Sequence, residues 1–208
     1  MLVADDHLLV AEALKSLLTP EFELVGVVED GRELIEAAVT LRPDVIVADV
    51  TMPNLNGIDA LTRLRQDGLT VPFVFLTMHR DVTFARRALE AGASGFVLKH
   101  SAPDELLTAI HAALQGNTYV TPHLAGEVLD AMRQGPEHVE DPTARLTLRQ
   151  REVLQLLAEG RSAKQIASRL SISTRTVEFH KYQMMEALGL QTNADLVHFA
   201  IKHGIVEF

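Results

Sequence analysis

Residues 44–57 read DVIVADVTMPNLNG, and this stretch decides the fold of the first half of the chain. Four apolar residues, Val45–Ala48, run between Asp44 and Asp49, and a turn containing Pro, Asn and Gly follows. An uninterrupted apolar run of this length, bounded by turn signals, is typical of a strand covered on both faces of its sheet. The stretch therefore predicts a buried strand that ends at an aspartate beside a tight turn.

Short apolar runs alternate with amphipathic helical patterns on both sides of this stretch. The expected strands are Leu2–Ala4, Glu23–Val28, Asp44–Ala48, Pro72–Leu76 and Gly95–Leu98. The expected helices are Leu8–Leu18, Arg32–Leu41, Ile58–Gln66, Val82–Ala91 and Pro103–Gln115. Such alternation implies parallel strands with right-handed crossovers, in a three-layer α/β domain of five strand–helix units.

The composition narrows the class of protein. The chain has 208 residues, of which 47% are hydrophobic and 23% charged, as in a folded protein rather than a disordered one. It has no cysteine, which excludes disulfides, thiolate metal sites and cysteine catalysis. No apolar run is long enough to span a bilayer, and the first residues lack the pattern of a signal peptide. We therefore expect a cytoplasmic protein with no membrane partner.

The net charge of −9 conceals an asymmetry. Residues 1–144 contain 10 Lys or Arg and 22 Asp or Glu, a balance of −12. Residues 145–208 contain 9 and 6, a balance of +3. An acidic part joined to a mildly basic part predicts two domains with different partners, one of which could be a polyanion.

The sequence between these two parts indicates a linker. Thr121 and Pro122 have the pattern of a helix N-cap and first turn, and a polar, proline-bearing segment at 135–142 follows the predicted helix. We expect an α/β domain at 1–116, a helical linker and loop at 117–144, and a helical domain at 145–208.

The last part reads as four short helices with clear start signals. Three pairs have the spacing of a capping box or nearly so: Thr147 with Gln150, Ser162 with Gln165, and Thr192 with Asp195. One helix ends in a tight turn at Ser171–Ile172, and Ser173 is placed to cap the next helix, Thr174–Leu188. Two short helices around such a turn form a helix-turn-helix.

In a doubly wound sheet, functional groups collect at the carboxyl ends of the strands. The polar residues there are Asp5, Asp6, Asp49, Thr77 and Lys99. Three neighbouring carboxylates repel one another unless a cation joins them, and all-oxygen ligation favours Mg²⁺. Taken singly, an aspartate or Thr77 is more simply a helix cap, and Lys99 a solvated surface lysine. Their placement together favours a cation and phosphate site.

Residues 1–115 resemble the receiver domain of two-component response regulators. The matching segments are ADDH at 4–7, DVIVADVTMPNLNGIDAL at 44–61, FLTMH at 75–79 and AGASGFVLK at 91–99. The resemblance implies a CheY-like fold, a five-stranded parallel sheet of order 2-1-3-4-5, and phosphoryl transfer from a sensor histidine kinase. Asp49 would be the phosphoacceptor, Asp6 a direct Mg²⁺ ligand, Asp5 a ligand through metal-bound water, and the Thr51 carbonyl the backbone ligand.

The resemblance also assigns the remaining pocket residues. Thr77 and Lys99 would contact the phosphoryl oxygens, and Phe96 would be the aromatic switch. Thr51 and His79 would flank the path of the water that removes the phosphoryl group. A haloacid-dehalogenase-type phosphatase also phosphorylates an aspartate but places a general-acid aspartate two residues later, where this chain has Thr51. We therefore expect that the protein is not an enzyme, and that its receiver catalyses only its own phosphorylation and dephosphorylation.

Residues 146–208 resemble the LuxR-type (NarL/FixJ) helix-turn-helix domain. The matching segments are LTLRQREVLQLLAEGRSAKQIASRLSISTRTVEFHK at 146–181 and ALGLQTNADLVHFAIKHGI at 187–205. On the helix Thr174–Leu188, one face carries apolar Phe179 and Tyr182 beside Arg175 and Glu178, at helical spacing. An outer face of this kind needs a partner surface, and the DNA major groove is suitable. Alternatively, Phe179 and Tyr182 could pack on the linker or on the α/β domain.

The expected DNA-binding residues lie on the helix-turn-helix. They are Lys164, Ser173, Thr174, Arg175, Thr176, Glu178, Phe179, Lys181 and Tyr182.

Together the two resemblances predict a DNA-binding transcriptional response regulator, activated by phosphoryl transfer to Asp49. We expect it to form a homodimer when phosphorylated and to bind an operator in double-stranded DNA. The alternative is a phosphorylation-independent DNA-binding regulator that uses its receiver only for dimerisation.

Overall fold

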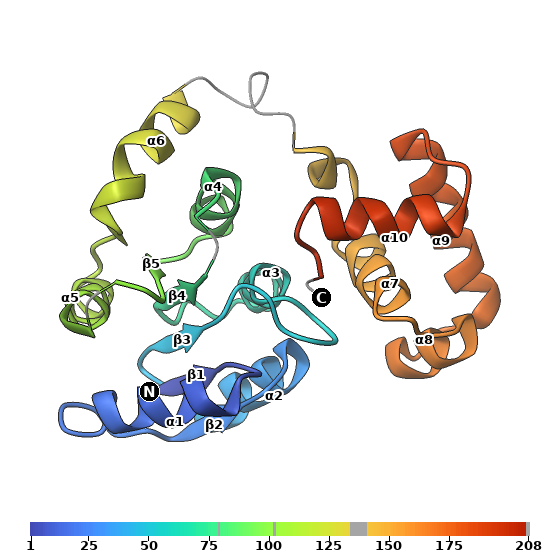
Figure 1. Ribbon diagram of the computed structural model, residues 1–208. Coiled ribbons are helices and arrows are strands. Elements are labelled where there is room, and N and C mark those ends of the chain that lie inside the picture. The colour runs from blue at the N-terminus through green and yellow to red at the C-terminus, as the bar shows by residue number, and fades with distance from the viewer. Residues whose placement is uncertain (79, 102, 134–140, 207–208) are drawn as a thin grey trace. The chain divides into compact units, whose positions relative to one another are not determined.

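The computed structural model describes residues 1–78, 80–101, 103–133 and 141–206 (Figure 1). His79 and residues 135–140 of the predicted linker loop lie outside the described residues. The chain divides into two compact units, with the boundary at Asp141. Each unit is described by itself.

A parallel sheet forms the centre of the first unit. Its strands are β1 (Leu2–Ala4), β2 (Gly26–Val28), β3 (Ile46–Ala48), β4 (Phe73–Thr77), β5 (Gly95–Leu98) and β6 (Tyr119–Val120). The order is β2-β1-β3-β4-β5-β6, so the expected order of the first five strands is confirmed. β1, β3, β4 and β5 are buried throughout, as their nearly continuous apolar sequences predict.

The expectation of five strands is wrong by one. Tyr119 pairs with Gly95 and Val120 with Phe96, which adds β6 to the sheet beside β5. A two-residue strand is too short to show alternating polarity, so the sequence pattern merged it with the linker. The β-branched and aromatic side chains of Val120 and Tyr119 nevertheless suit a strand.

Helices cover both faces of the sheet (Figure 1). They are α1 (Leu8–Leu18), α2 (Gly31–Leu41), α3 (Gly57–Gln66), α4 (Val82–Glu90) and α5 (Pro103–Leu114). Leu14 and Leu18 of α1 pack in one cluster with Ile110 of α5 and with alternate strand residues such as Val47 and Val97. The other face buries large side chains, including Phe73, Phe75 and Phe96.

The predicted linker helix is α6 (Pro122–Arg133), and it packs against α4 of the first unit. Leu124, Val128 and Ala131 form its buried stripe. Thr121, which precedes the helix, is 2% exposed; its backbone N–H donates to the Phe96 carbonyl at 3.0 Å. Its hydroxyl oxygen accepts from the Leu98 N–H at 3.2 Å. The start of α6 is therefore joined by hydrogen bonds to β5.

The second unit consists of helices. They are the 3-10 helix η1 (Pro142–Arg145), α7 (Leu148–Ala158), α8 (Ala163–Leu170), α9 (Thr174–Leu188) and α10 (Asn193–Lys202). All three expected capping pairs are present as capping boxes. Ser171 adopts the left-handed conformation (φ 53°) between α8 and α9, and the Ser173 oxygen accepts from the Thr176 N–H at 3.0 Å. The expected helix-turn-helix is confirmed.

A single apolar cluster holds these helices together. Its buried members include Val153, Ile166, Val177, Met184 and Leu196, one or more from each α-helix. The described part of the chain contains no helix that is both long and apolar enough to cross a membrane.

Candidate functional site

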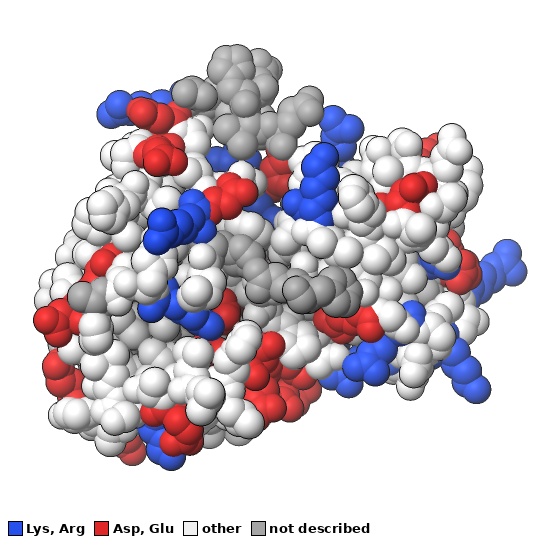
Figure 2. Space-filling view, viewed as in Figure 1, with Lys and Arg blue, Asp and Glu red and all other residues white. Residues whose placement is uncertain are grey.

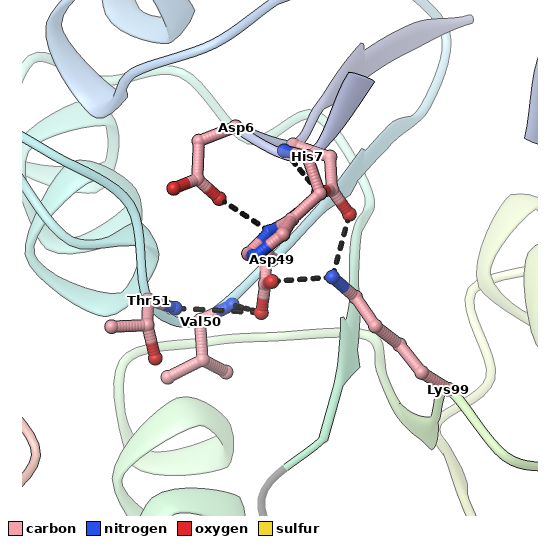
Figure 3. A network of polar contacts seen from close by, with 7 residues as sticks. Asp6, His7, Asp49, Val50, Thr51 and Lys99 are labelled. Carbon is pink, nitrogen blue, oxygen red and sulfur yellow. Dashed lines mark hydrogen bonds and ion pairs between the residues drawn. The ribbon is translucent and has the colours of Figure 1, made fainter. Parts of the chain in front are cut away.

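The carboxyl ends of the central strands bring predicted polar residues together, among them Asp6, Asp49 and Lys99 (Figure 3). Asp5 follows β1, Asp49 follows β3, Thr77 ends β4 and Lys99 follows β5. Asp5 and Asp49 are 1% and 6% exposed. Because neighbouring parallel strands end at one edge of the sheet, residues far apart in sequence form one pocket.

Lys99 bridges the two buried carboxylates. Its Nζ lies 2.5 Å from Asp49 Oδ2 and 2.7 Å from Asp5 Oδ2, and its side chain is 9% exposed. Burial raises the pKa of Asp49, while the Lys99 charge partly counteracts this increase. Burial alone would lower the pKa of Lys99, but the charges and hydrogen bonds of Asp49 and Asp5 raise it. The ammonium group is therefore a permanent cation within this acidic pocket.

The turn after β3 donates backbone hydrogen bonds to the Asp49 carboxylate. The backbone N–H groups of Val50 and Thr51 donate to Asp49 Oδ1 at 2.6 and 3.4 Å. Gly57 begins α3 so close to β3 that a Cβ there would lie 2.2 Å from the Asp49 carbonyl oxygen. The turn can therefore close only if residue 57 has no side chain. This explains the glycine in the stretch that predicted the fold.

Asp6 and His7 lie at the same edge and complete a cluster of possible metal ligands. The ligand atoms of Asp5, Asp6, His7 and Asp49 all lie within 4.8 Å of one another. His7 Nδ1 is 2.9 Å from Asp6 Oδ1, and Asp6 is partly exposed. Three carboxylates, one of them open to solvent, fit a hard divalent cation that retains water ligands. Sequence reasoning did not include His7, although it directly follows the acid pair.

Thr77 ends β4 and Phe96 lies within β5, and both are 0% exposed. The Phe96 ring packs on Phe75, with ring centroids 6.4 Å apart. The backbone N–H of Lys99 donates to the Thr77 carbonyl at 2.8 Å. Both predicted switch residues are therefore buried, Thr77 on β4 and Phe96 on β5, the strand that Lys99 follows.

The predicted DNA-binding residues form a second candidate site on the helix-turn-helix. Phe179 and Tyr182 are 56% and 66% exposed despite their size. Exposed polar residues surround them or lie on the neighbouring helix: Lys164, Ser173, Thr174, Arg175 and Glu178. Thr176 is partly exposed. The opposite stripe of α9, with Val177 and Met184, is buried.

Lys181 has a different environment from its neighbours on α9. It is only 9% exposed, and its ammonium group lies 3.1 and 3.0 Å from the two carboxylate oxygens of Glu178. The structure places this cation beside an acid one turn earlier on α9. The contact of Lys181 to DNA stays a prediction. On the face shown in Figure 2, other Lys and Arg side chains project from the second unit.

His180 of α9 is partly buried, at helical spacing from Val177 and Met184. Within the described residues its Nδ1 is buried and has no hydrogen-bond partner. Burial, together with the nearby positive charge of Arg149, lowers the pKa of His180. The imidazole is therefore neutral at physiological pH, which agrees with a packing role.

Comparison with known proteins identifies both units. A family model for the response regulator receiver domain matches residues 1–111. A second model, for bacterial regulatory proteins of the luxR family, matches residues 144–200. The chain belongs to the LuxR-type response regulators. This response regulator is 33% identical to the oxygen regulatory protein NreC of Staphylococcus aureus (strain MRSA252), and the match covers 100% of the chain and 99% of NreC.

Solved structures of similar proteins agree with this assignment. One is RcsB from Salmonella enterica serovar Typhimurium bound to promoter P1flhDC in the presence of the phosphomimetic BeF3−. It is 26% identical, covers 97% of each chain and has a TM-score of 0.64. Another is a LuxR-family two-component response regulator from Aurantimonas sp. SI85-9A1, 34% identical, with a TM-score of 0.60. That match covers 64% of this chain and 96% of the other. This response regulator is therefore a DNA-binding regulator of transcription rather than a classical enzyme.

Proposed function

We propose that Asp49 accepts a phosphoryl group from a sensor histidine kinase and that this modification controls operator binding by α9. The supporting observation is the position of Asp49 at the end of β3, with the Lys99 ammonium 2.5 Å from its carboxylate. One Asp49 oxygen would attack the phosphorus of a phosphohistidine. The P–N bond would break, and its electron pair would return to the imidazole of the kinase.

Mg²⁺ is the cofactor that the donor set fits. Asp5, Asp6 and Asp49, with the carbonyl of Thr51, would hold it, and when bound it would neutralise charge on the transferring group. Lys99 would exchange the Asp49 carboxylate for a phosphoryl oxygen while Asp5, 2.7 Å away, continues to hold its ammonium. The Thr77 hydroxyl would contact another phosphoryl oxygen. Transfer then requires mainly positioning and a fixed charge.

The contacts around β5 provide a route from the phosphoryl group to the linker helix. Movement of Thr77 and Phe96 would act on α4, which contacts α6, and on β5, which pairs with β6. Thr121 is hydrogen-bonded to both Phe96 and Leu98. A displacement of β5 would therefore reach α6 directly.

The output would be binding of DNA by a phosphorylated homodimer. We assign the receiver to 1–116, the linker and loop to 117–144 and the DNA-binding domain to 145–208, acting in the cytoplasm. Helix α9 would enter the major groove with Phe179 and Tyr182, and the exposed residues around them would contact bases or phosphates. Two linked copies gain affinity by effective concentration without new contacts, which suits a mildly basic domain.

Labelling with acetyl phosphate and Mg²⁺, followed by intact-mass measurement, tests the proposal. We expect the wild-type protein to gain one phosphoryl group and Asp49→Asn to gain none, because an amide cannot attack phosphorus. Asp44→Asn is the matched control, since Asp44 is exposed and precedes the same strand. Labelling that persists in Asp49→Asn would refute the site. Absence of labelling in all three proteins would favour a receiver used only for dimerisation.

A further inference from the structure

We propose that Glu178, held in place by Lys181, determines operator specificity by accepting a hydrogen bond from the N4 amino group of a cytosine. The inference deepens the proposed function, because it requires that α9 enters the major groove. It concerns the only exposed residue of α9 whose side chain is fixed by a buried lysine among the described residues.

The contacts between Lys181 and Glu178 hold the Glu178 carboxylate in one position. The Lys181 side chain is 11% exposed and the Glu178 side chain 57% exposed. The two carboxylate oxygens of Glu178 lie 3.1 and 3.0 Å from the same nitrogen. A buried lysine stem cannot swing into solvent as a surface lysine does, so its ammonium anchors the exposed carboxylate against the helix. Glu178 is thus ordered before it meets DNA, which lowers the entropic cost of a directed contact.

The positive charge of Lys181 offsets the repulsion that a glutamate on a DNA-binding helix would otherwise experience from DNA phosphates. A lone carboxylate would be repelled by DNA phosphates, but the Glu178–Lys181 pair has no net charge. A carboxylate has about four lone-pair positions, and the lysine uses only some of them. The pair can therefore approach the groove and still accept a hydrogen bond.

The chemistry of the groove selects the base. In the major groove, guanine offers only acceptors and thymine an acceptor with a methyl group, whereas cytosine offers a donor at N4. Adenine offers a donor at N6 beside an acceptor at N7, which would repel the second carboxylate oxygen. An acceptor-only side chain fixed in position consequently favours cytosine.

The experiment is a selection from a library of random DNA duplexes with the full-length protein after treatment with acetyl phosphate and Mg²⁺. We compare wild type with Glu178→Gln. Glu186→Gln is the control, because it removes the same charge from an exposed position later on α9. We expect wild type and Glu186→Gln to select cytosine at one position of each half-site. Glu178→Gln should select adenine there, since an amide both donates and accepts.

The size of the effect and the role of Lys181 can be read from the same selection. The preference for cytosine should fall about five- to a hundredfold in Glu178→Gln, with the rest of the half-site unchanged. Lys181→Met should weaken the same preference at this position alone, as expected for a positioning residue. If Glu178→Gln selects the same base as wild type, the inference is wrong. If wild type selects no sequence at all, the proposed function fails instead.

Discussion

Two lysines of this protein are nearly buried, and they hold their acidic partners in opposite ways. Lys99 contacts Asp5 and Asp49, both of which are buried with it. Lys181 contacts Glu178, most of whose side chain faces solvent. In the receiver, both acids are nearly buried together with the lysine, so we expect the pairing to change when another cation or a phosphoryl group enters the pocket. On α9, the acid already faces outward, so the lysine orients it for an external partner.

The ion pairs of Lys99 and Lys181 should also differ in their contribution to stability. Removing one member of a buried ion pair leaves an uncompensated charge, which costs far more than losing an exposed pair. The two lysines should therefore respond differently to the same substitution. The predictions below test that difference, beginning with the largest effect.

Lys99→Met should lower the free energy of unfolding by roughly 3 kcal/mol in the absence of divalent cations, because two buried carboxylates lose their counter-charge. Mg²⁺ should reduce the loss by supplying a replacement cation. Urea denaturation with EDTA and with Mg²⁺ measures both values. Lys15→Met is the control, since Lys15 is exposed and 3.9 Å from Glu12. A loss equal to that of Lys15→Met would show that the pocket does not depend on Lys99.

Thr121→Val should lower the free energy of unfolding by about 1–3 kcal/mol, since the buried Leu98 N–H loses its acceptor. Thr121→Ser keeps the hydroxyl and should retain more of the stability. Urea denaturation compares the two variants. Equal stability of the valine and serine variants would remove the hydrogen bond from the proposed route between the phosphoryl group and α6.

Lys181→Met should cost less than about 1 kcal/mol, because Glu178 can turn to water once its partner is absent. The measurement is the same urea denaturation, so the result can be set directly beside that of Lys99→Met. A loss as large as in Lys99→Met would mean that Glu178 is not free to rehydrate. The contrast between the two lysines would then be invalid.

The smallest effect concerns His180, whose pKa is lowered in the folded protein by burial and by Arg149. The unfolded chain binds the proton more readily, so the stability contribution is fully present above the ordinary histidine pKa of about 6.5. It is lost progressively as the pH falls through the lowered pKa. His180→Gln should reduce this part of the pH dependence in denaturation curves. An identical pH profile in the variant would contradict the assignment.

Sequence reasoning located the receiver pocket because the topology determines it. Once parallel strands are predicted, Asp5, Asp49 and Lys99 must meet at one edge, whatever their separation along the chain. It did not foresee the environment of Lys181, because charge counting treats every cation on a helix as exposed. The three-residue spacing from Glu178 indicated the ion pair, but burial of the lysine side chain depends on tertiary packing. Strand β6 was missed for a similar reason, because its two residues are recognised by their pairing with β5 and not by a sequence pattern.

The central claim is that phosphorylation of Asp49 controls DNA binding. The most direct measurement is enrichment of genomic DNA fragments by wild type and Asp49→Asn, each with Mg²⁺ and with or without acetyl phosphate. We predict that acetyl phosphate increases enrichment of specific fragments for wild type and leaves Asp49→Asn unchanged. Equal enrichment of the same fragments under all four conditions would contradict the claim.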